Sequence, residues 1–354
     1  MEKKSRIYSY DIIRIIAVLA VVTIHSASNL LTKSEFGSLN FTLGNLLDSL
    51  SRLAVALFLM ISGSLMLNEN RSIPAKKFLR SAANIYFLLL IWSALYAVTF
   101  KILYPLVTHR AINLKEFIKA FLNGHYHLWY LVMIVGLYLL TPVLRSFVKK
   151  ENIKVVGYLL IITAVIYLLP VLLNVFANII LPYKNIIKSY SSNFKFTYTN
   201  EFLFYYLAGW FITNYKLTST QRRFLYAGGT AGLFVTFIAT QFYKGNNDSY
   251  SLFYSTAMLN VVIYAVAVFT FFHYSFKDKA PGKKTKTITT LSALTFGVYL
   301  IHPAFLFVIR TLVTNKMTIG IITYIIEFTG ALVLSFASAF IMSKIPLIKK
   351  LIRC

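Results

Sequence analysis

The sequence predicts an all-α, polytopic membrane protein with about ten transmembrane helices and both termini in the cytoplasm. Hydrophobic residues make up 58% of the 354 residues and charged residues only 13%, about half the charged share of an ordinary soluble domain. Stretches of about 20 nearly uncharged residues recur along the chain, and each can cross ~30 Å of hydrocarbon as a helix. These runs are continuously apolar, which excludes the alternating pattern of a membrane β-barrel.

The apolar runs place ten spans in order along the chain. They cover 12–31, 45–67, 80–104, 127–147, 153–176, 200–215, 223–243, 252–273, 289–313 and 318–343. The first run follows basic residues, as a signal peptide does, but it is long and contains Arg14 and His25, so we expect an uncleaved span. Close helix packing is predicted where small residues lie inside spans, at Ser62, Gly63, Gly136 and Gly209.

Positive charge sets the predicted orientation. With the N-terminus inside, 22 of the 36 Lys and Arg fall in cytoplasmic segments, nine in outer loops and five within or at the edges of spans. A net charge of +25 indicates nucleic acid in a soluble protein. Here the charges lie in short loops between apolar spans, so we expect anionic lipid headgroups as their partners and no nucleic acid.

We expect one integral membrane domain, residues 1–354, whose helices themselves form the site. The longest predicted outer loops, near 105–126 and 177–199, are only about 22 residues each. The single cysteine, Cys354, allows no internal disulfide, so the fold depends on helix packing.

Ionisable residues inside spans are functional candidates because each costs ~2.5–3.5 kcal/mol on insertion scales. Arg14 and His25 are eleven residues apart, which places them on one face of the first span, some 16 Å apart along its axis. Taken singly, Arg14 could snorkel to the headgroups and His25 could be a packed, satisfied histidine. Together on one face they favour a functional pair, with His25 as a general base near mid-membrane.

The second span begins with Asp48 and Arg52, an i, i+4 pair that is either a structural ion pair or part of the site, with Asp48 orienting His25. After this span, the stretch KKFLR places Lys77 and Arg80 at the cytoplasmic edge. These two are either membrane anchors or, with Arg14, a clamp for the phosphates of a cytoplasmic ligand.

Further polar residues lie at the outer end of span four and inside spans nine and ten. In HYHLWYL, Trp129 and Tyr130 are typical of an aromatic belt at the membrane interface. His125 and His127 have no nearby Cys or carboxylate that would complete a metal site, so we expect no metal. A polar path toward the outer face is predicted from residues of spans two, nine and ten, namely Arg52, Tyr299, His302, Arg310 and Glu327. Glu327 is alternatively a protonated or Arg-paired structural group.

Five motifs in order along the chain resemble the acyltransferase-3 family of integral membrane acyltransferases. They are YSYDIIRIIAVLAVVTIH, SRLAVALFLMISGSLML, KKFLR, HLWYLVMIVGLYLLTPVL and FGVYLIHP. The first is similar to the family's Arg or Lys that precedes a His by ten intervening residues. KKFLR is similar to its cytoplasmic basic motif, with Lys77 where Arg is usual, and Lys offers a point charge instead of a bidentate fork. Among subgroups the chain looks most like stand-alone members similar to the enterobacterial common antigen O-acetyltransferase, without an extra extracytoplasmic domain.

The resemblance implies a multi-pass enzyme of the bacterial cytoplasmic membrane with no tightly bound cofactor. It would take an acyl group, usually acetyl, from cytoplasmic acyl-coenzyme A to a hydroxyl of an envelope glycan or lipid-linked sugar. Acetyl, succinyl and other short acyl groups stay open, as does the acceptor. The competing hypotheses are a transporter or flippase of an anionic envelope precursor and a sensory or structural membrane protein. A transporter more often shows two related halves with broken spans, and no such repeat is visible.

Overall fold

The computed structural model describes residues 6–179, 199–243, 249–276 and 285–352. Within these ranges the chain is helical and contains no strand. Several residues used in the charge count, and the cysteine, lie outside them: Lys3, Lys4, Lys184, Lys188, Lys195, Lys244, Lys277, Lys279, Lys283, Lys284, Arg353 and Cys354.

Helix follows helix along the whole described chain. The helices are α1 (Tyr8–Thr32), α2 (Leu39–Ser51), α3 (Ala54–Met66), α4 (Ala75–Val98), α5 (Tyr104–Val107), α6 (Leu114–Asn123), α7 (Trp129–Phe147), α8 (Ile153–Ile179), α10 (Thr199–Asn214), α11 (Ser219–Phe242), α12 (Leu259–Phe276), α13 (Thr285–Leu312) and α14 (Ile321–Lys344). A π-helical segment, Thr99–Leu103, joins α4 to α5.

Eight helical segments of the described chain are long and apolar enough to cross a membrane by length and composition: Tyr8–Thr32, Leu39–Met66, Ala75–Val107, Trp129–Phe147, Ser219–Phe242, Leu252–Phe276, Thr285–Lys316 and Ile321–Lys344. They match eight of the ten predicted spans. The other two predicted spans, 153–176 and 200–215, fall on α8 and α10, which are not among the eight. The count of ten and the cytoplasmic location of the termini remain predictions.

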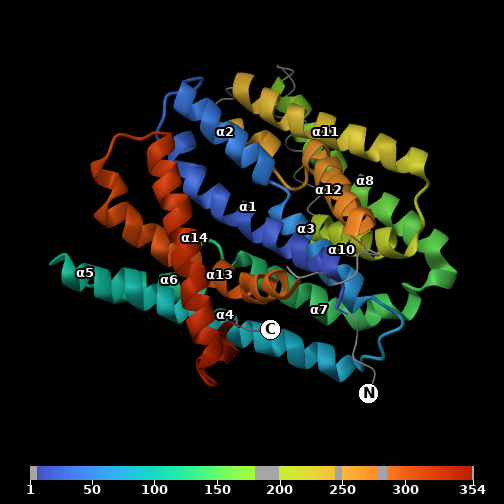
Figure 1. Ribbon diagram of the computed structural model, residues 1–354, viewed down its shortest axis with the longest axis horizontal. Coiled ribbons are helices and arrows are strands. Elements are labelled where there is room, and N and C mark those ends of the chain that lie inside the picture. The colour runs from blue at the N-terminus through green and yellow to red at the C-terminus, as the bar shows by residue number, and fades with distance from the viewer. Residues whose placement is uncertain (1–5, 180–198, 244–248, 277–284, 353–354) are drawn as a thin grey trace.

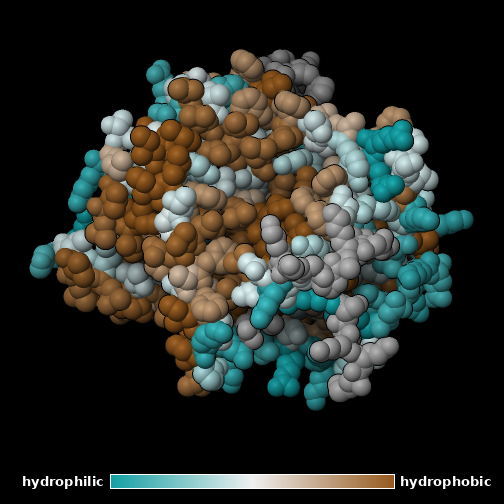
Figure 2. All heavy atoms as spheres, in the orientation of Figure 1, coloured by the Kyte–Doolittle hydropathy of each residue, from teal (hydrophilic) through white to brown (hydrophobic). Residues whose placement is uncertain are grey.

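The connections between helices alternate between two ends of the bundle. Figure 1 shows the α3–α4, α7–α8 and α10–α11 connections at the right-hand end, and the α1–α2 and α13–α14 connections at the left. This alternation is what successive crossings require. In the same orientation, hydrophobic residues cover much of the left and centre of the face, and hydrophilic side chains gather toward its lower right (Figure 2).

α1 is the central helix of the bundle. It packs against α2, α3, α12, α13 and α14, and a contiguous hydrophobic core draws residues from the first helix to the last. Because α1 contacts so many neighbours, the residues along it can meet side chains from distant parts of the sequence.

Two glycines allow α3 and α10 to approach closely. A Cβ on Gly63 would overlap the backbone carbonyl of Tyr206, and a Cβ on Gly209 would overlap that of Met60. The predicted close packing at these two positions is confirmed. At Gly136 it is wrong, since no heavy atom lies within 4 Å of the position that a Cβ would take.

Two segments differ from the sequence-based expectation. The span predicted as 45–67 is divided into α2 and α3, and the Ser51 hydroxyl donates to the Leu47 carbonyl (2.8 Å) just before the break, a bond that tends to bend helices. The predicted outer loop 105–126 contains α6, whose first turn is capped by the Asn113 side chain. Leu114, Ile118 and Leu122 recur at i, i+4 spacing there, which favours an amphipathic helix.

Candidate functional site

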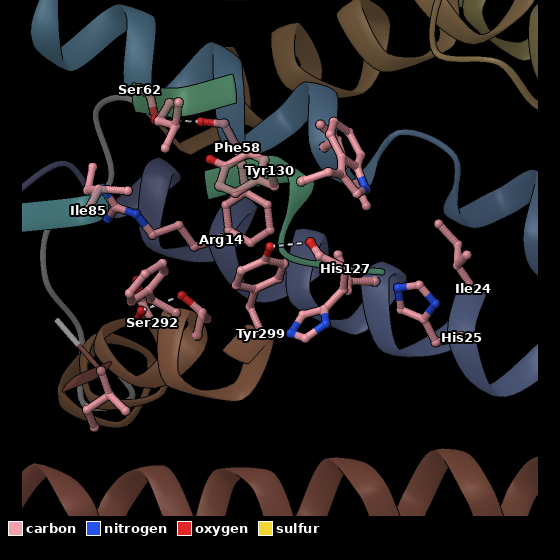
Figure 3. A pocket seen from close by; sticks show the side chains of 18 of the residues that line it. Arg14, Ile24, His25, Phe58, Ser62, Ile85, His127, Tyr130, Ser292 and Tyr299 are labelled. Carbon is pink, nitrogen blue, oxygen red and sulfur yellow. Dashed lines mark hydrogen bonds between the residues drawn. The ribbon is translucent and has the colours of Figure 1, made fainter. Parts of the chain in front are cut away.

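One pocket of about 580 Å³ lies among α1, α3, α4, α7 and α13. Figure 3 shows Arg14 toward one end and His25 toward the other, with His127 and Tyr299 between them. Arg14 and His25 therefore open into the same pocket, as their spacing predicts. The charged and imidazole side chains that line it are Arg6, Arg14, Arg52, His25 and His127, and no Asp or Glu of the described ranges lines it.

The Arg14 end of the pocket is formed by Arg6, Arg14 and Ser292 around Asp11. The Asp11 carboxylate is only 1% exposed and lies in the first turn of α1, where the helix dipole favours negative charge. Arg6 donates to both of its oxygens (2.7 and 2.9 Å), and Arg14 (3.3 Å) and Ser292 (2.7 Å) donate to Oδ1. Two guanidiniums thus share one carboxylate, so this end keeps a net positive charge suited to an anion.

At the other end four of the six histidines gather in a histidine cluster, defined as His25, His125, His127 and His302. The His302 ring stacks on that of His25 at 5.2 Å between centroids, and lies 5.7 Å from that of His127. Nδ1 of His127 is 2.9 Å from Nδ1 of His125, so one ring donates to the other. The Tyr299 hydroxyl donates to the His127 carbonyl (2.5 Å).

Pro303 sets the tautomer of His302. A proline has no N–H, so the Tyr299 carbonyl four residues earlier lacks its usual helix donor. Nδ1 of His302 lies 2.8 Å from this carbonyl oxygen and 3.1 Å from that of Val298. Carbonyls only accept, so Nδ1 carries the proton and, in the neutral ring, Nε2 carries the lone pair. Nε2 is buried and has no hydrogen-bond partner among the residues that the structure describes.

His125 closes the cluster outside the membrane-spanning segments. Its ring stacks on Tyr96 at 4.2 Å and on Phe100 at 5.2 Å between centroids. This burial lowers the pKa of His125 to about 4, because a charged imidazolium would lose its hydration there. His125 is therefore neutral at physiological pH.

Arg310 and Glu327 support the backbone of His25. Arg310 donates to the His25 carbonyl through Nη2 (2.7 Å) and to Glu327 through Nε (2.8 Å). Glu327 also accepts from Asn29 (3.2 Å) and Thr314 (2.8 Å), so its carboxylate is fully paired. Of the five residues predicted to form a polar path, two line the pocket. Tyr299 and Arg52 line the pocket, whereas His302, Arg310 and Glu327 are engaged beside it and do not line it.

Asp48 pairs with Arg52, as the i, i+4 spacing predicts, through Nε (2.9 Å) and Nη2. The described residues show no hydrogen bond between Asp48 and His25, so the predicted orienting contact is absent. The Asp48 carboxylate is buried and forms its ion pair with Arg52 instead.

Lys77 and Arg80 lie in the first turns of α4, are exposed, and do not line the pocket. Ile85, further along the same helix, does line it. The two cations are thus close in sequence to the pocket wall, and phosphate binding by them stays a prediction.

The sequence-based reasoning missed three contributors: Asp11, Arg6 and His127. The i, i+3 spacing of Asp11 and Arg14 was a signal for the first, but the partner Ser292 lies 281 residues away in the sequence. The sequence places His127 beside the aromatic belt of Trp129 and Tyr130 and suggests no role for it beyond a metal ligand, yet it is 2% exposed and lines the pocket with Tyr130. Among the described residues, no group of three or more His, Cys, Asp or Glu could hold a metal ion.

Comparison with known proteins gives one match. The profile of the acyltransferase-3 family, described as an acyltransferase domain, matches residues 7–344. No curated protein and no solved structure matches, so the likeness to the enterobacterial common antigen enzyme remains a prediction. The matched region includes α1 to α14. Of the five Arg and His residues that line the pocket, it includes four and leaves out Arg6. The chain therefore belongs to the acyltransferase-3 family and is a membrane acyltransferase.

Proposed function

We propose that this protein is an O-acyltransferase, most simply an O-acetyltransferase, which moves an acyl group from cytoplasmic acyl-coenzyme A to a hydroxyl of an envelope glycan or glycolipid. The observation that carries the proposal is the pocket itself. Among the described residues it is lined by three arginines and no carboxylate, and it brings His25 together with aromatic and aliphatic side chains.

The donor fits the charge distribution of the pocket. Coenzyme A is a polyanion, and its phosphates would lie at the Arg14 end, with Lys77 and Arg80 contributing from the start of α4. Its extended pantetheine arm could cover the ~16 Å between Arg14 and His25 along α1. The thioester would then lie at the His25 end, where Tyr299 and His127 also line the pocket.

His25 is the proposed general base. It removes the proton of the acceptor hydroxyl as that oxygen attacks the thioester carbonyl, and it returns the proton to the departing thiolate. Arg310 and Glu327 hold its backbone, and His302 packs against its ring. A positioned base contributes about 10²–10⁴-fold in rate, which sets the size of the expected defect.

The test uses matched histidine variants in membranes that carry the full chain. We expect His25→Asn to lose about 10²–10⁴-fold of labelled acetyl transfer from acetyl-coenzyme A to envelope material. His109→Asn serves as the control, because His109 is exposed, does not line the pocket, and has a positive φ of 54° that Asn tolerates.

Both variants must be present at wild-type levels in the membrane fraction. Mass spectrometry of glycans from cells with and without the protein identifies the lost ester. Near wild-type transfer by His25→Asn would remove His25 from the chemistry, and an unchanged glycan profile would contradict the acyltransfer to envelope sugars.

A further inference from the structure

We propose that Arg52 stabilises the oxyanion that develops on the thioester carbonyl oxygen, and that Asp48 and Tyr254 are positioning residues for it. This inference rests on the proposed function and deepens it. Arg52 then not only lines the pocket but also stabilises the transition state.

Arg52 occupies the break between α2 and α3, directly after Ser51 and two residues before Ala54. It lines the same pocket as His25 and His127. Its side chain is 26% exposed, in contrast to the 1% of its partner Asp48. The guanidinium is thus the open member of this ion pair.

The guanidinium is fixed from behind by two groups. Asp48 accepts from Nε and Nη2 on a single oxygen, Oδ2. The Tyr254 ring lies 4.2 Å from the guanidinium carbon, in cation–π geometry. The Tyr254 hydroxyl in turn donates to Oδ1 of Asn45 (2.7 Å), whose amide donates to the Phe237 carbonyl (2.9 Å).

Arg52 donates through Nε and Nη2 to Asp48, and its Nη1 donates to no acceptor among the described residues. Two hydrogens therefore remain for a ligand on a side chain that is already oriented. Preorganised donors of this kind stabilise transition-state charge because they need not reorient as the charge develops.

The charge balance distinguishes the two ends of the pocket. Two guanidiniums, those of Arg6 and Arg14, face one carboxylate at the Arg14 end, which suits a permanent polyanion. At the His25 end one guanidinium faces one carboxylate. That pair is neutral overall, so it does not retain a permanent anion strongly, yet its open N–H groups can accept a charge that exists only in the transition state.

The step balances without any other reactant. The acceptor oxygen forms a bond to the acyl carbon, its proton passes to His25, and the carbonyl π pair moves onto oxygen facing Arg52. When the tetrahedral intermediate collapses, the carbonyl re-forms, the carbon–sulfur bond breaks, and the thiolate takes the proton from His25. The products are the ester and free coenzyme A.

The test measures release of the coenzyme A thiol from acetyl-coenzyme A by full-length protein in nanodiscs, with water as acceptor, beside acetyl-coenzyme A binding. We expect Arg52→Gln to lower kcat about 10²–10³-fold and to change the Kd for acetyl-coenzyme A less than about twofold. Arg52→Lys should keep part of the rate because it keeps the charge. Asp48→Asn should lower kcat with little change in KM.

Arg222→Gln is the matched control. Arg222 also stacks on a tyrosine, 4.3 Å from the Tyr274 ring centroid, but it does not line the pocket. Its kcat and Kd should equal those of the wild type. Added guanidinium should partly restore the rate of Arg52→Ala, which a purely structural role for Arg52 would not allow.

Two results would overturn the inference while leaving the proposed function intact: a wild-type kcat in Arg52→Gln, or a loss of acetyl-coenzyme A binding as large as the loss of rate. If Arg52→Gln does not insert, Asp48→Asn and the guanidinium titration of Arg52→Ala decide the matter. Absence of both binding and thiol release in the wild type would contradict the proposed function and this inference together.

Discussion

At the residue scale, the histidine cluster shows how neighbours set the chemistry of a side chain. His302 has a fixed Nδ1 proton because Pro303 has no N–H to donate to the Tyr299 carbonyl, which His302 Nδ1 approaches instead. His125 is kept neutral by burial against the rings of Tyr96 and Phe100. Identical side chains, close together, therefore perform different tasks.

The lowered pKa of His125 predicts a pH-dependent stability. Between the ordinary value of 6.5 and the folded value of about 4, the unfolded chain binds a proton at this residue and the folded protein does not. The free energy of unfolding should therefore fall as pH drops through this window and receive no further contribution from His125 below about pH 4. Thermal unfolding in detergent at stepped pH measures it, with wild type and His125→Phe compared. A difference between the two that stays constant from pH 7 to pH 4 would contradict the assignment.

At the scale of elements, α3 and α10 touch through a reciprocal pair of glycines. The Tyr206 carbonyl of α10 occupies the space that a Cβ on Gly63 would take, and the Met60 carbonyl of α3 occupies the space that a Cβ on Gly209 would take. The backbones of the two helices are therefore in direct contact. This contact fixes α3, and with it the wall of the pocket that Phe58 and Ser62 form.

Gly63→Ala should destabilise the protein by about 1–3 kcal/mol, because the added methyl group must push the Tyr206 carbonyl away. Gly136→Ala is the matched control in α7, where a Cβ meets no heavy atom within 4 Å. That substitution should be neutral or stabilise by up to ~1 kcal/mol through helix propensity. Unfolding midpoints of the two variants in the same detergent give the comparison. Equal midpoints would show that α3 and α10 are not held at this distance.

At the scale of the whole molecule, the arrangement predicts which ends of the bundle face the cytoplasm. The α1–α2 and α3–α4 connections lie at opposite ends (Figure 1). From the excess of Lys and Arg we predict that the α3–α4 connection lies in the cytoplasm and the α1–α2 connection on the outer side.

Cysteine labelling tests this orientation, since Cys354 is the only native cysteine. In a Cys354→Ser background, Glu35→Cys should react with a membrane-impermeant maleimide in intact cells. Asn70→Cys should react only after permeabilisation. Both positions are exposed, so burial does not limit either reaction. The reverse pattern would show that the protein has the opposite orientation in the membrane. Labelling of both cysteines in intact cells would contradict the alternation of crossings.

The sequence by itself determined the features that depend on composition and on spacing within one helix. The apolar runs predict eight spans that match helices of the structure long and apolar enough to cross a membrane. Helical periodicity predicts that Arg14 and His25 lie on one face of their helix and that Asp48 pairs with Arg52. These relations are local, because helix geometry sets them without any knowledge of the neighbours.

Only the tertiary structure decided which helices meet. Asp11 joins Ser292, His25 stacks on His302, and Arg310 binds the His25 carbonyl across 285 residues of sequence. Such contacts depend on the packing of whole helices against one another, in which many small contributions together select one arrangement. Periodicity along a single helix carries no information about which helices lie next to it. For this reason no hydrogen bond joins Asp48 to His25 among the described residues, and it is Arg52, the partner of Asp48, that lines the pocket with His25.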